Sequence, residues 1–312
     1  MRIILICKDM GGYIGKLAAF LQTQGHEVLM LDTTRSSPPL EVLPGKLRSV
    51  ARRHLGNWLD EAKIRKFGRS DVLLVVNPGQ SEPQVIKAAM KVASIKKAYL
   101  YDSLARCPMP AGSFTEFDQI YSFDHTDVAA LGLTKLYNFM YEPEEARRPA
   151  APYKHKAFVV MSGEDRLQLL DKIALQLEQA NYPNYSFRVQ TRKKPAPDSK
   201  IIHTRERISL DDVKAQIQDA EILVDLIRPQ QSGLSFRFFE AMQHQRKVIT
   251  DNTSVLAYDF YHPHNILVID NQDPQIPAAF LNTPYTPLPR EVFDKYSLAG
   301  WCSTVFAPIA KR

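Results

Sequence analysis

Short apolar runs rich in β-branched residues alternate along the chain with stretches in which apolar residues recur every three or four positions. The first pattern predicts buried strands and the second predicts amphipathic helices. In the first half, strands are expected at 2–7, 27–32, 72–77, 97–101, 119–123 and 134–138, with helices at 13–24, 46–67, 82–93 and 125–131. In the second half, strands are expected at 157–161, 186–191, 200–203, 221–226, 247–250 and 265–269, with helices at 164–180, 210–219 and 234–244. Such alternation is typical of a parallel sheet covered by helices on both faces.

A proline-rich stretch, 141–155, interrupts the alternation and predicts a linker. The expected fold class is therefore α/β, with two doubly wound Rossmann-like domains facing across a cleft. A chain of 312 residues is long enough for two such domains. The expected boundaries are 1–145 for the N-terminal domain, 155–285 for the C-terminal domain and 286–312 for a C-terminal helix, whose amphipathic part is 290–309.

The composition is that of an ordinary globular protein, with 45% hydrophobic and 24% charged residues. No apolar run approaches the roughly 18 residues that span a bilayer. The three cysteines, Cys7, Cys107 and Cys302, are odd in number and far apart. This excludes a disulfide framework and a paired-cysteine metal site, and it favours the reducing cytoplasm.

Positive charge is concentrated in one segment. The chain has 40 Lys and Arg against 34 Asp and Glu, a net charge of +6. Residues 46–69 contain eight Lys and Arg but only two acidic residues, Asp60 and Glu61, so this segment carries as much excess positive charge as the whole chain. The eight basic residues are Lys46, Arg48, Arg52, Arg53, Lys63, Arg65, Lys66 and Arg69. The segment is expected to be a basic amphipathic helix that lies on an anionic membrane surface or is simply solvated. Zinc-finger spacing and RNA-binding aromatic strands are absent from the sequence, so no nucleic acid partner is expected.

The first loop, KDMGGYIG, partly matches a dinucleotide-binding fingerprint. That fingerprint needs glycine at positions 10, 12 and 15. The chain has Met10, Gly12 and Gly15, with Gly11 between them, and Asp32 ends the next predicted strand. The loop is therefore either an NAD(P) site that lacks its first glycine or a plain strand–helix junction whose glycines let the backbone turn.

Residues 224–252 carry the strongest binding signal. A predicted strand leads through a polar loop, RPQQSG, into a helix. Ser232 and Gly233 are therefore expected at a helix N-terminus, where free N–H groups and the positive end of the helix dipole suit a diphosphate. Arg228 and Arg237 can add charge-assisted bonds to phosphate oxygens. The alternative is an ordinary α/β unit with a capped helix.

The same stretch resembles the nucleotide-sugar-binding element of GT-B glycosyltransferases, particularly bacterial enzymes that build capsule, O-antigen or lipopolysaccharide core. In that family a Gly-rich loop leads into a helix of the form FEAM or EALA and then into a strand like VI-T-D. The matching residues here are Gly233-Leu234, Phe239-Glu240-Ala241-Met242 and Val248-Ile249-Thr250-Asp251. The resemblance implies a nucleotide-sugar site on the second domain and a final helix that crosses back onto the first.

The retaining branch of that family has two glutamates separated by seven residues, of which the second contacts the donor ribose. Glu240 matches the second, and a carboxylate there suits paired hydroxyls. The first falls on Ser232, so the stereochemical outcome stays open. The donor site that the resemblance implies comprises Ser162, Gly163, Arg192, Arg228, Gln231, Ser232, Gly233, Leu234, Arg237 and Glu240.

Several polar residues follow strands of the first domain, at the edge where ligands bind in open α/β sheets. An inverting transferase needs a base to take the proton of the acceptor hydroxyl. The candidates for this base are Asp102 and His125, and the candidates for acceptor contacts are Asp9, Gly11, Gly12 and Asp124. Each aspartate alone is also a common helix-cap or turn residue.

The sequence has no D-x-D motif, which favours a metal-independent GT-B site over a metal-dependent GT-A site. His262-Pro263-His264 has no carboxylate or cysteine nearby at ligand spacing. No cofactor is expected beyond the nucleotide-diphosphate sugar.

The expected function is transfer of a sugar from such a donor to a surface-glycan acceptor, free or lipid-linked, by a cytoplasmic enzyme that is peripheral on the inner face of the membrane. The alternatives are an NAD(P)-dependent oxidoreductase that uses the first loop, a GT-B-like sugar-nucleotide epimerase, and a non-catalytic nucleotide-sugar binder.

Overall fold

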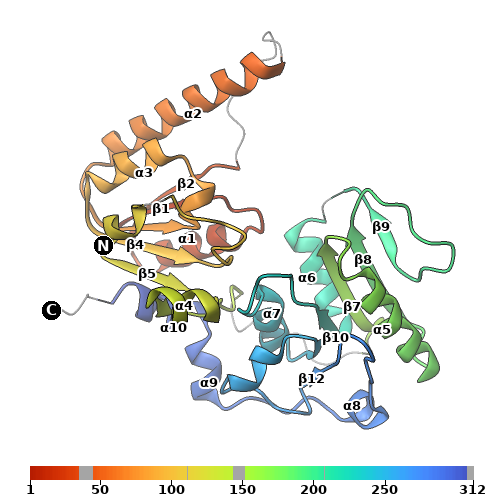
Figure 1. Cartoon of the computed structure of the whole chain (residues 1–312). Helices are drawn as coiled ribbons and strands as arrows, with labels where there is room; N and C mark the ends of the chain where they lie inside the picture. The colour runs from red at the N-terminus through yellow and green to blue at the C-terminus, as the bar shows by residue number, and fades with distance from the viewer. Residues whose placement is uncertain (35–44, 111, 143–151, 207, 308–312) are drawn as a thin grey trace. The chain divides into compact units, whose positions relative to one another are not determined.

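The computed structural model describes residues 1–34, 45–110, 112–142, 152–206 and 208–307, and it describes only the helical backbone of residues 45–52. The chain forms two compact units (Figure 1). Unit 1 is Met1–Tyr137 together with the residues from Thr304 onward, and unit 2 is Asn138–Ser303. Most of the expected linker, 143–151, lies outside the described residues, so the domain boundaries drawn from the sequence stay a prediction.

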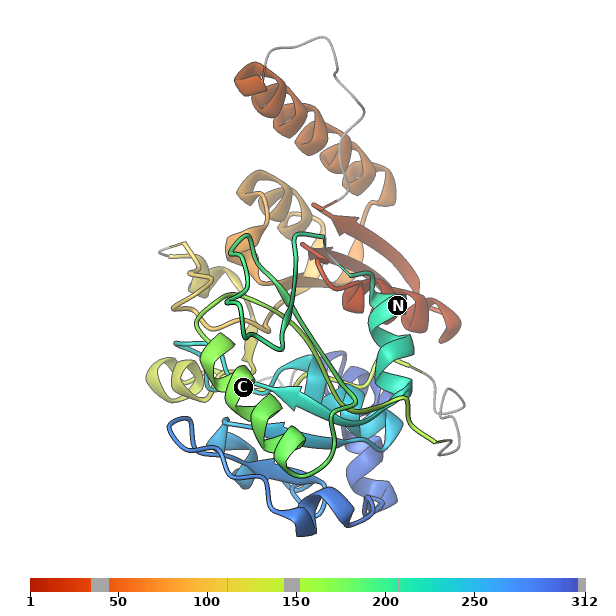
Figure 2. The same cartoon turned by 90° about the vertical axis from the view of Figure 1, so that its right-hand side faces the viewer.

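Unit 1 contains a parallel six-stranded sheet in the order β2-β1-β3-β4-β5-β6. Its strands are β1 (Arg2–Cys7), β2 (Glu27–Asp32), β3 (Ser70–Val76), β4 (Ala93–Leu100), β5 (Gln119–Ser122) and β6 (Thr134–Lys135), and its helices are α1 (Tyr13–Thr23), α2 (Gly45–Phe67), α3 (Pro83–Met90) and α4 (His125–Leu131), with short turns η1 (Pro78–Gln80) and η2 (Ser113–Glu116). The central strands β1 and β3 are buried along nearly their whole length, as their continuous apolar runs predict. Helix α2 packs against α3 (Figure 2).

Unit 2 repeats this architecture with a parallel sheet in the order β12-β11-β10-β7-β8-β9. Its strands are β7 (His155–Ser162), β8 (Tyr185–Gln190), β9 (Ile202–Thr204), β10 (Ala220–Asp225), β11 (Lys247–Thr250) and β12 (Ile266–Val268). Its helices are α5 (Leu167–Gln179), α6 (Leu210–Gln218), α7 (Phe236–His244), α8 (Ala278–Asn282), α9 (Arg290–Lys295) and most of α10 (Leu298–Val305), and the 3-10 helix η4 (Thr253–Ala257) also lies here. The predicted α/β class with two doubly wound domains is confirmed.

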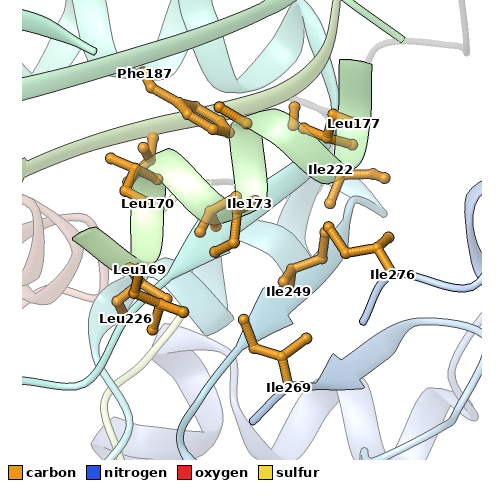
Figure 3. Close-up of a cluster of buried hydrophobic side chains, with 14 of the residues drawn as sticks. Leu169, Leu170, Ile173, Leu177, Phe187, Ile222, Leu226, Ile249, Ile269 and Ile276 are labelled. Atoms are coloured by element: carbon orange, nitrogen blue, oxygen red, sulfur yellow. The ribbon is translucent and has the colours of Figure 1, made fainter. Parts of the chain in front are cut away.

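The core of unit 2 lies between α5 and the sheet (Figure 3). Leu170, Ile173 and Leu177 on α5 recur at helical spacing, and each is fully buried. They pack against Ile222 and Ile249, which lie on the central strands. Burying each such side chain contributes about 1.5–3 kcal/mol, so this packing fixes the sheet whose ends carry the polar loops.

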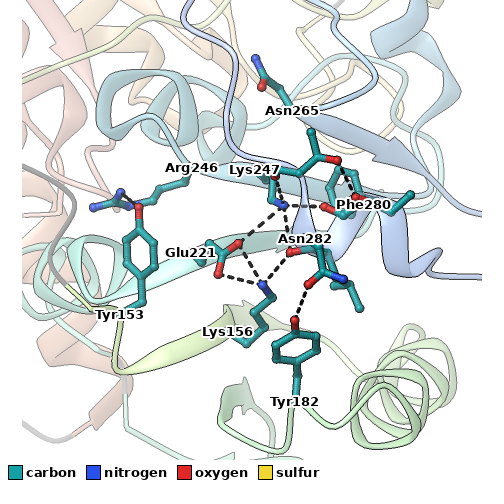
Figure 4. Close-up of polar contacts among 12 residues, drawn as sticks. Tyr153, Lys156, Tyr182, Glu221, Arg246, Lys247, Asn265, Phe280 and Asn282 are labelled. Carbon is teal, nitrogen blue, oxygen red and sulfur yellow. Dashed lines mark hydrogen bonds and ion pairs between the residues drawn. The ribbon is translucent and has the colours of Figure 1, made fainter.

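A cluster of charged side chains lies at the amino edge of the same sheet, and its members hydrogen-bond to one another and to backbone carbonyls (Figure 4). Lys156 Nζ donates to both oxygens of Glu221 at 2.9 Å and to the Leu281 carbonyl at 2.7 Å. Lys247 Nζ donates to the Phe280 carbonyl at 2.5 Å, and burial lowers the pKa of Lys247. These carbonyls belong to α8, whose last turn lacks helical donors, so the two lysines fasten α8 to the sheet.

The C-terminal region differs from the expected single helix over 290–309. Helix α9 ends at Lys295 and α10 begins at Leu298. Met140 N–H donates to the Tyr296 carbonyl at 2.8 Å, and Ser297 Oγ accepts the Gly300 N–H at 3.1 Å, so the chain pairs with another segment and starts a new helix. Helix α8 was not expected within a proline-rich stretch. None of the helices in the described part of the chain is long and apolar enough to cross a membrane.

Candidate functional site

The strands β7, β10 and β11 end side by side at one edge of the unit 2 sheet. Ligands of parallel α/β sheets bind beyond this carboxyl edge. Two loops leave the sheet there, 163–166 after β7 and 226–235 after β10. We call residues 162–166 and 226–235 the carboxyl-edge site, and most of the predicted donor residues lie in it.

Two guanidinium groups lie close together in this site. Arg166 is 8% exposed, and its Nη1 donates to the Leu226 carbonyl at 2.7 Å. Its Nη2 donates to the Ser162 carbonyl, and its Nε is buried without a hydrogen-bond partner among the described residues. Arg228 Nη2 donates to Ser162 Oγ at 3.0 Å. Burial and, to a smaller extent, the neighbouring Arg228 lower the pKa of Arg166, while the carboxylates of Asp165, Asp225 and Asp251 act in the opposite direction.

Two carboxylates hold the longer loop from the ends of β10 and β11. Asp225 Oδ1 accepts Ser235 Oγ–H at 2.6 Å, and Asp251 Oδ1 accepts the Ile227 N–H at 2.7 Å. Burial raises the pKa of both carboxyl groups. These aspartates therefore shape the loop through hydrogen bonds at its two ends.

The same loop is also fixed through its carbonyl groups. Ser254 Oγ donates to the Ser232 carbonyl at 2.7 Å, and Asn252 Nδ2 donates to the Gly233 carbonyl at 3.3 Å. Asn138 Nδ2 donates to the Leu234 carbonyl at 2.9 Å. Because the peptide bonds are trans, each N–H that follows points away from the group that holds its carbonyl. The N–H groups of residues 233–235 are therefore directed away from Ser254, Asn252 and Asn138, respectively.

Helix α7 begins two residues later than the sequence pattern indicates. Its N-cap is Ser235, whose Oγ accepts the Arg237 N–H at 3.1 Å while donating to Asp225. Ser232 and Gly233 therefore lie in the loop before the helix rather than at its first turn. Asp225 causes the shift, because it fixes the serine that caps the helix.

The loop after β7 requires a glycine. Gly163 has φ +98°, and a Cβ there would lie 2.8 Å from Asp165 Oδ1. Next to it, Glu164 accepts the Thr191 hydroxyl, while Arg192 is exposed. Gln231 is half-buried and its N–H donates to the Arg228 carbonyl at 3.3 Å. Leu234 is fully buried, so only its backbone is available to a ligand.

Glu240, the residue expected at the ribose, is 2% exposed. Its Oε2 accepts Arg237 Nη1 at 2.6 Å, and its Oε1 accepts the Tyr141 hydroxyl at 2.6 Å. The Arg237 side chain is therefore directed to Glu240 in this structure. Side chains of the protein therefore engage both carboxylate oxygens of Glu240.

The first loop of unit 1 is organised by carboxylates. Asp9 Oδ2 accepts the Gly15 N–H at 2.8 Å, and its Oδ1 is buried without a hydrogen-bond partner in the described part of the chain. Asp32 Oδ1 accepts the Asp9 N–H at 3.1 Å. Burial raises the pKa of Asp9. Gly12, with φ +80°, is the N-cap of α1, and a Cβ on Gly11 would lie 2.2 Å from the Tyr13 ring.

The candidate bases in unit 1 have different surroundings. Asp102 pairs with Arg106 at 3.5 Å. Asp124 is 1% exposed and caps α4 by accepting the Thr126 and Asp127 N–H groups, which accounts for its burial. His125 is the first residue of that helix, and burial lowers its pKa, so the imidazole is neutral near pH 7.

Several residues of the carboxyl-edge site were not expected from the sequence. Arg166, Asp225, Ser235 and Asp251 all contribute contacts there. The sequence could have indicated Ser235 and the two aspartates, because polar residues that follow a strand or precede a helix often cap the helix or hydrogen-bond to the loop. No feature of the sequence indicates that Arg166 is buried in the site, since an arginine at the start of a helix is usually exposed. No group of three or more His, Cys, Asp or Glu suited to a metal ion occurs among the described residues.

The chain was compared with known proteins. No protein-family model matches it, and no curated protein matches it by sequence. A UDP-forming α,α-trehalose-phosphate synthase from Burkholderia xenovorans in complex with glucose-6-phosphate matches with a TM-score of 0.57 at 10% identity, covering 98% of this chain and 99% of that one. The corresponding enzyme from Burkholderia vietnamiensis gives a TM-score of 0.53 at 11% identity, covering 98% and 96%. A UDP-GlcNAc 2-epimerase from Neisseria meningitidis bound to UDP-GlcNAc gives 0.51 at 9% identity, covering 98% of each chain. The likeness shows the fold: this chain has the two-domain Rossmann-like architecture called GT-B.

Proposed function

We propose that this protein is a glycosyltransferase that moves a sugar from a nucleotide-diphosphate sugar to a glycan acceptor. The observation that carries the proposal is the carboxyl-edge site of unit 2. There, two arginines lie at the sheet edge beside a loop in which the protein holds the carbonyls of three successive residues, 232–234. A diphosphate needs this combination of cations and N–H donors.

In this proposal the diphosphate lies against Arg166, Arg228 and the N–H groups that follow Ser232, and Glu240 receives the ribose. The remaining predicted donor residues, among them Arg192 and Gln231, would border the same nucleotide. As the bond between the sugar and the phosphate oxygen breaks, negative charge grows on the diphosphate. Fixed cations stabilise that charge without reorganisation. In this proposal, as in the prediction from the sequence, the site uses no metal ion.

The acceptor would bind unit 1 near Gly11, Gly12 and Asp102. Its hydroxyl oxygen forms the new bond to the sugar and gives its proton to a base. The two candidates stay Asp102 and His125, and a neutral imidazole at His125 is able to accept a proton near pH 7. Substituting each residue in turn distinguishes them. Only loss of the residue that acts as the base should lower turnover by about 100-fold or more without weakening donor binding.

We infer a surface glycan as the acceptor class from the basic segment 46–69, which would keep the enzyme near a lipid-linked acceptor on the inner face of the membrane. Within its described side chains, Trp58 is 59% exposed and Lys66 is exposed. Binding to vesicles that contain anionic lipid, weakened by salt and by Trp58→Ala, is the expected result. Failure to bind at low salt would remove this part of the proposal.

A second candidate is a sugar-nucleotide epimerase, since an epimerase shares this fold. It would use the same donor site but no separate acceptor. An NAD(P) site on the first loop of unit 1 is less well supported, because Asp9 occupies the Gly15 N–H that a pyrophosphate would need. A non-catalytic binder would bind the nucleotide sugar and leave it unchanged.

The first experiment is calorimetric titration with UDP, GDP, CMP, NAD⁺ and NADP⁺, followed by incubation with the sugar form of the nucleotide that binds. Arg228→Ala should weaken binding of the nucleoside diphosphate about 10- to 100-fold. Arg290→Ala, which removes an exposed ion pair with Asp294, is the matched control and should change nothing. Binding of NAD⁺ or NADP⁺ alone would overturn the proposal.

A further inference from the structure

A tyrosine occupies the carboxylate that the proposed function assigns to the ribose. Tyr141 Oη donates to Glu240 Oε1 at 2.6 Å, and the two residues are 4% and 2% exposed. Both belong to unit 2, although Tyr141 is 99 positions earlier in the sequence. The sequence did not predict this contact, because local patterns say nothing about residues so far apart in the chain.

The position of the tyrosine is fixed by its neighbours. The Tyr141 ring lies edge-on to Phe236, with ring centroids 6.4 Å apart. Met140 N–H donates to the Tyr296 carbonyl at 2.8 Å, which holds the backbone next to it. Phe139 packs against the same Phe236 ring at a centroid distance of 5.3 Å, and its own ring centroid is 4.8 Å from that of Trp301. The hydroxyl is therefore presented to Glu240 by a packed segment.

The chemistry of this contact is that of a sugar hydroxyl. A phenol and a ribose hydroxyl each donate one O–H to a carboxylate oxygen. We propose that Tyr141 is an internal ribose substitute: its Oη holds Glu240 Oε1, and a nucleotide binds by replacing Tyr141 Oη with its own ribose hydroxyls. This inference rests on the proposed function, because it names the group that the ribose displaces.

The exchange lowers the affinity for nucleotide. Only molecules in which Tyr141 Oη has left Glu240 can bind the ribose. The apparent Kd is therefore the intrinsic Kd divided by the fraction of such molecules. The Tyr141 hydroxyl satisfies Oε1 of this buried carboxylate, while Arg237 pairs with Oε2. The exchange also favours ligands with hydroxyls at the ribose position over a free diphosphate.

The test is calorimetric titration of UDP and GDP into the wild-type protein, Tyr141→Phe and Tyr153→Phe. Tyr141→Phe keeps the ring and removes only the competing hydroxyl, so the Kd for the nucleotide that binds should fall about tenfold. Tyr153→Phe removes a hydroxyl that contacts Arg246 at the amino edge, and its Kd should equal that of the wild type. Glu240→Gln in the Tyr141→Phe background should abolish the gain, because the gain acts through that carboxylate.

The outcomes separate the two proposals. Binding to the wild type with an equal or higher Kd in Tyr141→Phe overturns the internal ribose substitute and leaves the donor site standing. Binding to none of the proteins overturns the donor site and this inference with it. Binding only to Tyr141→Phe supports both. Thermal melts without ligand check folding, and Tyr141→Leu serves as a second hydroxyl-free variant if Tyr141→Phe is unstable.

Discussion

The two units begin alike, with a strand, a glycine-containing loop and a helix, but a carboxylate holds the first loop and a guanidinium holds the second. In unit 1 the loop after β1 is held by Asp9, which accepts the Gly15 N–H. In unit 2 the loop after β7 is held by Arg166, which donates to the Ser162 carbonyl. A carboxylate uses up the N–H groups that an anion needs, whereas a guanidinium uses carbonyls and leaves the N–H side to a ligand. We therefore expect an anion site at only one of these two topologically equivalent loops.

The largest effect that would test this contrast is expected from Arg166→Met. It leaves the carbonyls of Ser162 and Leu226 without their donor, so the free energy of unfolding should fall by about 3 kcal/mol. Diphosphate binding should weaken at least ~30-fold. Urea unfolding and calorimetry measure the two effects, with exposed Arg290→Met as the control. A loss of stability below about 1 kcal/mol would show that the carbonyls do not depend on Arg166.

A matched pair of glycine substitutions compares the loops directly. Gly163 and Gly12 have φ +98° and +80°, a region that costs a side chain about 1–2 kcal/mol. Gly163→Ala and Gly12→Ala should therefore lower the melting temperature by similar amounts. Only Gly163→Ala should weaken diphosphate binding. Equal weakening by both variants would mean that the contrast between the loops is wrong.

The free energy of unfolding should depend on pH differently in the wild type and in Asp9→Asn. Burial raises the pKa of Asp9, so the folded protein holds this proton more tightly than the unfolded chain. The stability that Asp9 contributes therefore falls as pH rises through its folded pKa, and Asp9→Asn lacks this step. As pH rises from about 4 to about 8, the variant should gain stability relative to the wild type in urea unfolding. Parallel profiles would contradict the pKa shift, and diphosphate affinity should not change.

The smallest effect is expected from Ser162→Ala. It removes the hydroxyl that accepts Arg228 Nη2 at 3.0 Å but leaves both arginines in place. Diphosphate binding should weaken about fivefold, as one hydrogen bond to a charged group that is half-buried allows. Ser209→Ala is a control in the same unit, because that serine caps α6. It should lower stability by about 1 kcal/mol without changing the titration.

The elements and their order follow from the sequence because a strand or helix needs only the period of its own apolar residues. The strands with continuous apolar runs, such as β1 and β3, and the amphipathic α5 illustrate this. The start of α7 was misplaced by two residues, because its cap Ser235 is selected by Asp225 from another element. The break between α9 and α10 likewise depends on pairing with Met140, which local periodicity does not contain.

The candidate site divides in the same way. The sequence by itself placed a polar, glycine-containing loop with Arg228 at the carboxyl end of a strand, since loop position follows from strand order. Tertiary structure alone decided that Arg166 joins Arg228, that Arg237 is directed to Glu240, and that Tyr141 covers the other oxygen of that carboxylate. Charge and burial at a site depend on which distant residues share the same few ångströms, and packing decides that after the local elements have formed.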